Sequence, residues 1–137
     1  MQYNLILISF IYNQKGEILL TKRKREPGMG KWSFSGGVGA LKEESDPFKA
    51  VAKEVYFDFG VEYVEYALFA MKYENKNGPI LRLYFQGKIN AEPQIKGLNT
   101  IAELGWFSAS DVLGMELAFE EADKDVFKQF REQILSR

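Results

Sequence analysis

The stretch that decides the fold is residues 30–61, GKWSFSGGVGALKEESDPFKAVAKEVYFDFGV. A short aromatic strand comes first, and Gly36, Gly37 and Gly39 follow it. Asp46 followed by Pro47 indicates a helix start, because Asp accepts a free backbone N–H and proline has none to lose there. Gly60 suits the left-handed conformation that ends a helix. The stretch therefore predicts a strand, a glycine-rich loop and a helix that runs to about residue 59.

The segments around this stretch predict further strands, a small helix and a terminal helix. Residues 3–12 and 17–25 are expected to pair as a hairpin across the turn NQKG, and residues 61–74 and 79–89 across NKNG. A short strand at 104–107, a small helix capped by Ser108 or Ser110, and a last helix at 121–135 follow. The last helix carries an apolar face formed by Val126, Phe127, Phe130 and Ile134. This order predicts an α/β sandwich around a mixed sheet.

Composition excludes several classes of function. The 137 residues suit one domain, and a formal net charge of −1 gives no general attraction to nucleic acid or anionic membranes. Cysteine and histidine are both absent, which excludes disulfides, thiolate zinc sites and histidine-based triads. The N-terminal run has no basic leader and is too short to span a bilayer, so we expect a cytoplasmic protein without a membrane partner.

Glu54 and Asp58 lie four residues apart in the predicted helix, so their side chains project from one face. One interpretation is a solvated acidic edge relieved by Lys53, which is the default for surface carboxylates. The other interpretation follows from the surroundings, because Glu43 and Glu44 bring more carboxylates to the same junction of loop and helix. A divalent cation such as Mg²⁺ binds carboxylates together with water and substrate phosphates, and this junction offers such ligands.

Residues 36–61 resemble a divergent Nudix box, in which a glycine and a glutamate precede the pattern Arg-Glu-U-x-Glu-Glu-x-Gly-U, where U is aliphatic. The resemblance extends to GEILLTKRK at 16–24, GKWSFSGG at 30–37 and AELGWFSASDVLGMELAF at 102–119. It therefore covers most of the chain. It implies a single Nudix-like domain over residues 1–137, built as an α/β/α sandwich around a mixed β-sheet.

The chain departs from the family pattern at two places. When the end of the box is aligned on Gly60, Glu54 falls on the glutamate of Arg-Glu, and Phe57 and Asp58 fall on the paired glutamates. A phenyl ring thus replaces one carboxylate, and the segment between the glycines and the helix is two residues longer than the pattern. We expect Phe57 to pack in the core, the usual place for phenylalanine, rather than to stack on a substrate.

The resemblance implies a MutT-like pyrophosphatase, a hydrolase of a nucleoside diphosphate linked to another group, dependent on Mg²⁺ or Mn²⁺. It implies that Glu54, Asp58 and Glu44 bind the metal, and that Glu54 and Glu44 act in catalysis. A metal ion at phosphate oxygens offsets developing charge and lowers the pKa of a bound water.

Two arginines are candidate phosphate ligands. In the run TKRKR at 21–25, the alternation of a strand places Arg23 and Arg25 on one face and the lysines on the other. Arginine suits bidentate phosphate contact, and the resemblance implies a basic residue near this strand. An edge strand protected from aggregation by its charge explains the run equally well. Both interpretations stay open.

Other candidate substrate contacts carry competing structural explanations. Gly36 and Gly37 allow a backbone to approach a ligand closely. Trp32 either stacks on a base or packs in the core, which is the commoner role of strand aromatics. Glu120 corresponds to acidic residues that contact the base in purine-recognising relatives, but it also suits the acidic first turn of the last helix.

The sequence leaves two functions open. The first is a metal-dependent hydrolase that cleaves a pyrophosphate bond in a nucleotide or nucleotide derivative. The alternative, suggested by Phe57, is a catalytically impaired Nudix-like domain that binds a nucleotide or a protein partner. Nucleic acid is not an expected partner, because the charge is near neutral and there is a single short basic strand. A monomer and a homodimer are both compatible with the sequence.

Overall fold

The computed structural model describes residues 4–75 and 77–136, except for the side chains of Glu120 and Glu121. The strands in this part are β1 (Asn4–Ile11), β2 (Ile18–Arg23), β3 (Trp32–Gly37), β4 (Tyr63–Asn75), β5 (Pro79–Ile89) and β6 (Ile101–Phe107). The helices are α1 (Pro47–Phe59), α2 (Ala109–Gly114) and α3 (Glu120–Phe130), with a 3₁₀ turn η1 (Gly39–Lys42) and a π turn η2 (Arg131–Leu135).

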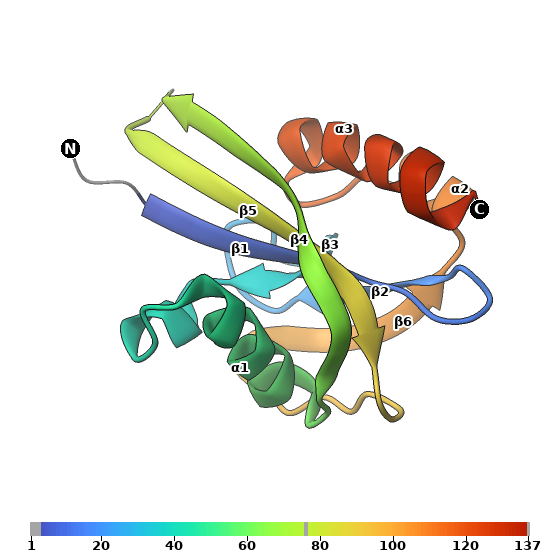
Figure 1. Cartoon of the computed structure of the whole chain (residues 1–137), viewed down its shortest axis with the longest axis horizontal. Helices are drawn as coiled ribbons and strands as arrows, with labels where there is room; N and C mark the ends of the chain where they lie inside the picture. The colour runs from blue at the N-terminus through green and yellow to red at the C-terminus, as the bar shows by residue number, and fades with distance from the viewer. Residues whose placement is uncertain (1–3, 76, 137) are drawn as a thin grey trace.

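The strands form one mixed sheet in the order β4-β5-β1-β3-β2-β6. β1 runs parallel to β5, and the remaining neighbours are antiparallel. Helix α1 covers one face of the sheet, while α2 and α3 lie on the other side (Figure 1). The predicted α/β/α sandwich around a mixed sheet is confirmed.

β3 lies between β1 and β2 and pairs with both. The predicted hairpin of β1 with β2 is therefore wrong, although a single bridge joins Tyr12 and Ile18 beside the turn. Gly36 explains how β3 fits there, because a Cβ on this residue would lie 2.2 Å from the carbonyl oxygen of Leu7 in β1. The sequence predicted that Gly36 and Gly37 lie in a loop. In the structure they form the end of β3.

Two apolar clusters fill the spaces between the sheet and its helices. On β1, Leu7 and Ile11 face α1, and Ile8 and Phe10 face α3, as the period of two along a strand requires. The predicted apolar face of the last helix is confirmed: Val126, Phe127 and Phe130 are fully buried, and Ile134 packs against the same cluster.

The ends of α1 match the sequence prediction. The Asp46 side chain accepts a hydrogen bond from the Phe48 N–H at 2.9 Å, and Gly60 ends the helix with a φ of 69°. The prediction that Phe57 packs in the core is wrong, because its side chain is 49% exposed. Residues two positions apart in an α-helix lie roughly 200° apart around its axis. Phe57 therefore faces away from Val55, which α1 buries.

Within residues 4–75 and 77–136, none of the helices combines the length and the apolar character needed to cross a membrane.

Candidate active site

Glu54 lies half-buried on α1, where its carboxylate meets the end of β3. Its Oε2 accepts a hydrogen bond from the Ala40 N–H at 3.2 Å. A Cβ on Gly37 would lie 2.6 Å from Oε1 of Glu54, so the carboxylate occupies space that only glycine leaves free. Burial raises the pKa of Glu54, and the hydrogen bond from Ala40 partly opposes this rise.

Asp58 lies one turn further along α1 and faces the loop before β6. Its Oδ1 lies 3.0 Å from the position of a Cβ on Gly97, and its backbone carbonyl accepts a hydrogen bond from the Lys96 N–H at 2.8 Å. Burial, followed by the negative charge of Glu54, raises the pKa of Asp58 to about 7. The two carboxylates are therefore close enough to interact, and neither is freely solvated.

Glu44 does not join this pair in the structure. Its carboxylate lies 3.6 Å from Nζ of Lys53 and accepts a hydrogen bond from the Asp46 N–H at 3.2 Å. No group of three or more acidic side chains arranged to hold a metal ion occurs among the residues that the structure describes. The roles predicted for Glu44 in metal binding and catalysis stay predictions.

Three further acidic residues, Glu74, Glu92 and Glu103, do not complete a group of three carboxylates with Glu54 and Asp58 either. Glu74 forms an ion pair with Arg82, and Glu103 forms one with Lys22 at 3.1 Å. Glu92 lines the cavity of about 430 Å³ that is described below.

A cavity of about 330 Å³ opens beside Gly37, lined in part by Ile8 and Phe34 of the apolar cluster that packs against α3. Its walls combine two arginines, two phenylalanines, one buried carboxylate and the glycine backbone. The lining residues are Ile6, Leu7, Ile8, Arg23, Pro27, Ser33, Phe34, Gly36, Gly37, Val38, Arg82, Phe119 and Asp123. The structure thus brings three of the predicted substrate contacts, Arg23, Gly36 and Gly37, to one cavity.

Arg23 is held in place at the cavity wall. Its Nε donates a hydrogen bond to the Pro27 carbonyl at 2.6 Å, and its guanidinium carbon lies 5.1 Å from the centre of the Phe119 ring. Burial, followed by the positive charge of Arg25, lowers the pKa of Arg23. A cationic group that is partly desolvated in this way attracts an anion more strongly than one in open water.

The other predicted substrate contacts lie apart from the cavity lining or beyond the described atoms. Arg25 is exposed and Trp32 packs edge-on against Phe107, with ring centres 4.9 Å apart. Glu120 begins α3, and its side chain lies outside the described residues. The substrate roles of these three residues stay predictions.

Asp123 and Arg82 were missed by the sequence reasoning. Asp123 is 5% exposed, and its Oδ1 accepts a hydrogen bond from the Tyr84 hydroxyl at 2.6 Å. Burial raises the pKa of Asp123. A signal was present, because Asp123 lies four residues before Phe127 and so falls on the apolar face of the last helix. An acidic residue on an apolar face indicates a polar partner or a ligand.

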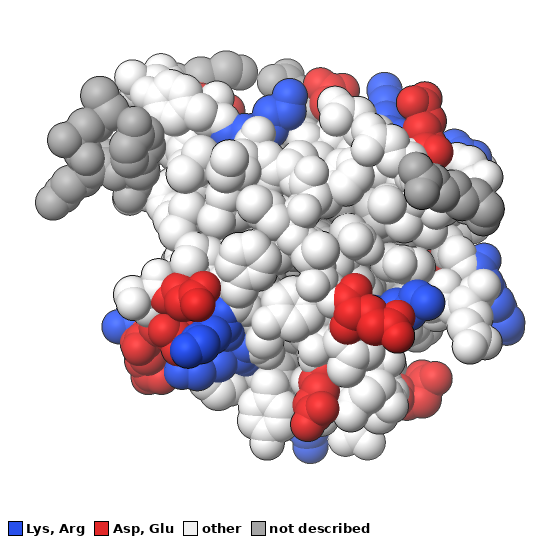
Figure 2. All heavy atoms as spheres, viewed as in Figure 1, with Lys and Arg blue, Asp and Glu red and all other residues white. Residues whose placement is uncertain are grey.

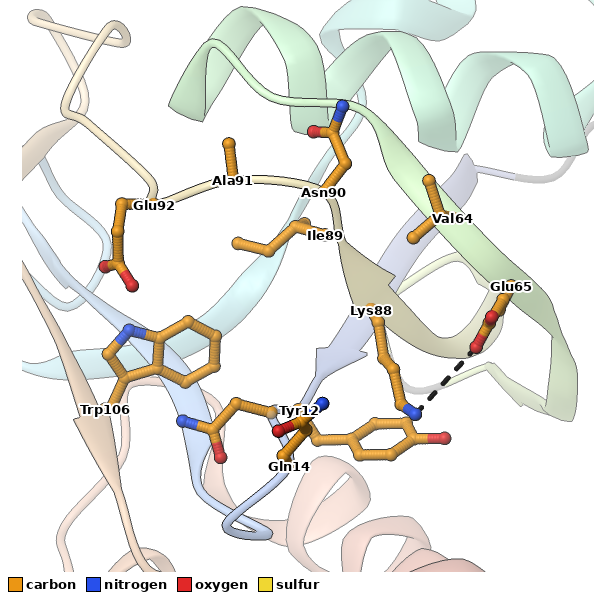
Figure 3. Close-up of a pocket in the computed structure, with 11 residues that line it drawn as sticks. Tyr12, Gln14, Val64, Glu65, Lys88, Ile89, Asn90, Ala91, Glu92 and Trp106 are labelled. Atoms are coloured by element: carbon orange, nitrogen blue, oxygen red, sulfur yellow. Dashed lines mark ion pairs between the residues drawn. The ribbon is translucent and has the colours of Figure 1, made fainter.

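A second cavity, of about 430 Å³, lies at the other end of the sheet's strands and contains none of the residues predicted for the site. Figure 3 shows Trp106 and Tyr12 along one side of it and the backbone of Ala91 along another. Its lysine, Lys88, already pairs with Glu65 at 3.8 Å (Figure 3), which reduces its attraction for a phosphate. The cavity beside Gly37 is the better candidate for a nucleotide site, because it contains Arg23, Gly36 and Gly37, although its second arginine, Arg82, also has an acidic partner in Glu74.

The chain belongs to the Nudix family, because the family model for the NUDIX domain matches residues 3–130. Among solved structures it is similar to the MutT protein from Methanosarcina mazei Go1, with 25% identity, 96% of this chain and 94% of that chain covered, and a TM-score of 0.77. It is also similar to the NUDIX domain of Shewanella oneidensis NrtR, solved in complex with ADP ribose, with 20% identity, coverage of 98% and 90%, and a TM-score of 0.81.

A third similar structure is the MutT NUDIX hydrolase from Burkholderia pseudomallei, with 22% identity, coverage of 94% of this chain and 98% of that chain, and a TM-score of 0.75. A comparison with curated protein sequences finds no match. Nudix proteins are generally hydrolases of nucleoside diphosphate derivatives and typically use divalent metal ions. The family and the fold predicted from residues 36–61 are confirmed.

Proposed function

We propose that this chain hydrolyses the pyrophosphate bond of a nucleoside diphosphate derivative with the help of one divalent metal ion. The observation that carries this proposal is the position of Gly37. Its backbone lines the cavity that contains Arg23 and Arg82, and its free side accommodates the carboxylate of Glu54. A pyrophosphate held by Arg23 would lie beside the backbone of Gly37, whose other side contacts the Glu54 carboxylate.

The donor chemistry of Glu54 and Asp58 fits a hard divalent cation. Both groups offer carboxylate oxygens, which Mg²⁺ and Mn²⁺ prefer, and Mg²⁺ sites in enzymes often use one or two carboxylates plus substrate phosphates. Burial raises the pKa of each group, and their mutual repulsion adds to the rise at Asp58. A bound cation would offset this charge. When bound, it would supply charge compensation for the phosphates and acidify a water molecule.

The residues of the chain have separable roles in this proposal. The Ala40 N–H orients Glu54, and Arg23 binds a phosphate oxygen while Phe119 holds its guanidinium. Phe34 offers an aromatic wall for a base or a ribose. Asp123, fixed by the Tyr84 hydroxyl, supplies a polar group that can read a hydrogen-bonding edge of the ligand.

The test is turnover of a panel of dNTPs, ADP-ribose and dinucleoside polyphosphates with Mg²⁺ or Mn²⁺. ADP-ribose belongs in the panel because the similar NrtR domain was solved with it. Glu54→Gln should lose at least about 10²-fold in kcat, as removal of a preorganised charged group typically does. Glu62→Gln, an exposed carboxylate just after α1, is the matched control and should keep the parent rate. Equal rates for Glu54→Gln and the parent would refute the proposal.

A second candidate is a domain that binds a nucleotide without cleaving it. The observation that favours it is Phe57, whose exposed ring stands where the family pattern has a glutamate, together with the engagement of Glu44 by Lys53. Calorimetry with ADP-ribose distinguishes the two. Binding that Arg23→Ala weakens, without product formation in either metal, would select the binding domain over the hydrolase.

A further inference from the structure

Arg23 is held in the cavity by two segments that lie far apart in the sequence. Arg82, the other arginine of the cavity, forms an ion pair with Glu74, whereas Arg23 is held by two uncharged groups. These are the Pro27 carbonyl, 2.6 Å from Nε, and the Phe119 ring, whose centre is 5.1 Å from the guanidinium carbon. Pro27 lies in the loop between β2 and β3, and Phe119 lies between α2 and α3. Neither group neutralises the charge that a phosphate would meet.

We call residues 115–119, which connect α2 to α3, the strap. The Ala118 N–H donates a hydrogen bond to the Trp32 carbonyl at 2.9 Å, and Leu117 forms a parallel bridge with Trp32. Leu117 is 2% exposed and packs in the apolar cluster on the α3 side of the sheet. The strap is therefore attached to the start of β3, and Phe119 follows directly after the attachment.

Gly28 is the point at which the loop before β3 touches the strap. Its φ is +80°, and a Cβ on it would lie 2.7 Å from the Cβ of Ala118 and 3.4 Å from Cδ of Arg23. Carbon atoms attract each other at about 3.5–4.0 Å and repel strongly at 2.7 Å. Gly30 has a φ of +83°, but a Cβ on it would meet no atom within 4 Å. Both positions thus favour glycine for the backbone, and only Gly28 also needs the empty space.

The way in which Arg23 is held matters for the affinity of an anion. A freely rotating arginine loses side-chain entropy when it binds, and an arginine that is already ordered loses less. On the face of the molecule that Figure 2 shows, Lys and Arg atoms are scattered beside Asp and Glu atoms, and the formal net charge is −1. That face provides no broad basic field that would attract a phosphate. The order of a single arginine therefore has more influence on binding.

We propose that the strap positions Arg23 for a substrate phosphate, through the contact of Gly28 with Ala118 and the contact of Phe119 with the guanidinium. Gly28 and Ala118 are positioning residues, because neither is among the residues that line the cavity. The role of Arg23 toward substrate rests on the proposed function, but its placement by the strap does not. An arginine that binds the substrate and the transition state equally changes KM and leaves kcat unaltered.

The first test compares the two glycines by enzyme kinetics. Gly28→Ala pushes the strap away from the loop and should raise KM about 3- to 10-fold at nearly constant kcat, which is the effect of leaving one long side chain unordered. Gly30→Ala imposes a similar backbone strain without the contact and should keep the parent KM. The double variant Gly28→Ala, Ala118→Gly removes the methyl group that the new Cβ would meet and should restore KM, and Ala118→Gly alone completes the cycle.

Equal KM values for Gly28→Ala and Gly30→Ala, or a double variant no better than Gly28→Ala, would overturn the proposal. A variant that merely lost folded protein would lower the apparent kcat and leave KM at the parent value. Circular dichroism shows whether each variant is folded.

The second test needs no substrate. The Arg23 Nε–H donates to the Pro27 carbonyl, so its NMR signal should be protected from exchange with water in the parent and in Gly30→Ala. The signal should be lost in Gly28→Ala and return in the double variant. Phe119→Leu, which removes the ring and keeps an apolar side chain, should also weaken the signal, and it tests the strap if Gly28→Ala does not fold.

The two tests separate this inference from the proposed function. A parent that neither cleaves nor binds any nucleotide of the panel would refute the proposed function, and the NMR signal alone would then decide whether the strap positions Arg23. An Nε–H signal that is the same in the parent, Gly28→Ala and Phe119→Leu would overturn the inference whatever the parent hydrolyses.

Discussion

Gly36→Ala should mainly lower the stability of the protein, and Gly37→Ala should mainly lower its activity. The two glycines have almost the same backbone angle, with φ of 157° and 156°. The backbone cost of replacing either glycine by alanine is therefore about the same. What differs is the atom that the new methyl group meets. At Gly36 it would lie 2.2 Å from the Leu7 carbonyl oxygen, and at Gly37 it would lie 2.6 Å from Oε1 of Glu54.

The magnitudes follow from what each neighbour can do. The Leu7 oxygen belongs to β1 and cannot move without parting two strands, so Gly36→Ala should lower the free energy of unfolding by about 3 kcal/mol or more, at the upper end of overpacking costs. The Glu54 carboxylate is the end of a flexible side chain and needs to move by roughly 1 Å to reach an ordinary contact distance. Gly37→Ala should therefore add about 1 kcal/mol or less beyond the shared backbone cost.

The loss of activity should be larger in Gly37→Ala than in the folded fraction of Gly36→Ala. A displacement of about 1 Å in a catalytic group can cost about 10²-fold in rate, so Gly37→Ala should be folded and nearly inactive. Urea denaturation gives the stability, and hydrolysis of the best substrate from the panel gives kcat/KM for the folded fraction. A Gly37→Ala variant with the parent rate would show that the Glu54 carboxylate does not act from its position against β3.

Three other substitutions test the site. Burial and Glu54 raise the pKa of Asp58 from 3.8 to about 7, so the folded metal-free chain keeps a proton that the unfolded chain releases, and its stability falls as the pH rises between these values. Asp58→Asn should reduce that slope in urea denaturation at several pH values, while Glu54 and Asp123, whose pKa values are also raised, keep their own contributions; a slope equal to that of the parent would mean that Asp58 does not contribute. Phe57→Glu should tighten Mn²⁺ binding in calorimetry about tenfold if its side chain borders the acidic pair. The exposed neighbour Tyr56→Glu is its control, and an equal gain there would indicate a nonspecific charge effect. Tyr84→Phe removes only the hydroxyl that donates to Asp123 and should cost about 1–3 kcal/mol in thermal or urea unfolding. A stability equal to that of the parent would mean that another donor replaces it.

The parts of the fold that local chemistry determines were predictable from the sequence. The start of α1 depends on Asp46 and its end on Gly60, and both effects act within a few residues. Glu54 and Asp58 could be placed together for the same reason, since a spacing of four in a helix is sufficient. The family resemblance of residues 36–61 then supplied the sandwich, which no local pattern determines.

The parts that depend on long-range packing were not predictable. The position of β3 between β1 and β2 depends on a close approach at Gly36 to a strand about thirty residues earlier. Arg82 and Asp123 reach the cavity from β5 and α3, and nothing in their own neighbourhoods identifies each as the other's neighbour. Phe57 was misplaced because its apolar character was given more weight than its angular position on the helix.

The insertion of β3 between β1 and β2 also affects the route by which the chain folds. The turn at residues 13–16 brings β1 and β2 together quickly, because short loops close within about 10–100 ns. In the native sheet the two strands are separated by a third that arrives later along the chain. A direct pairing of β1 with β2 formed early must open before β3 can enter, so a turn made more rigid than the natural one would delay folding while leaving the finished protein intact.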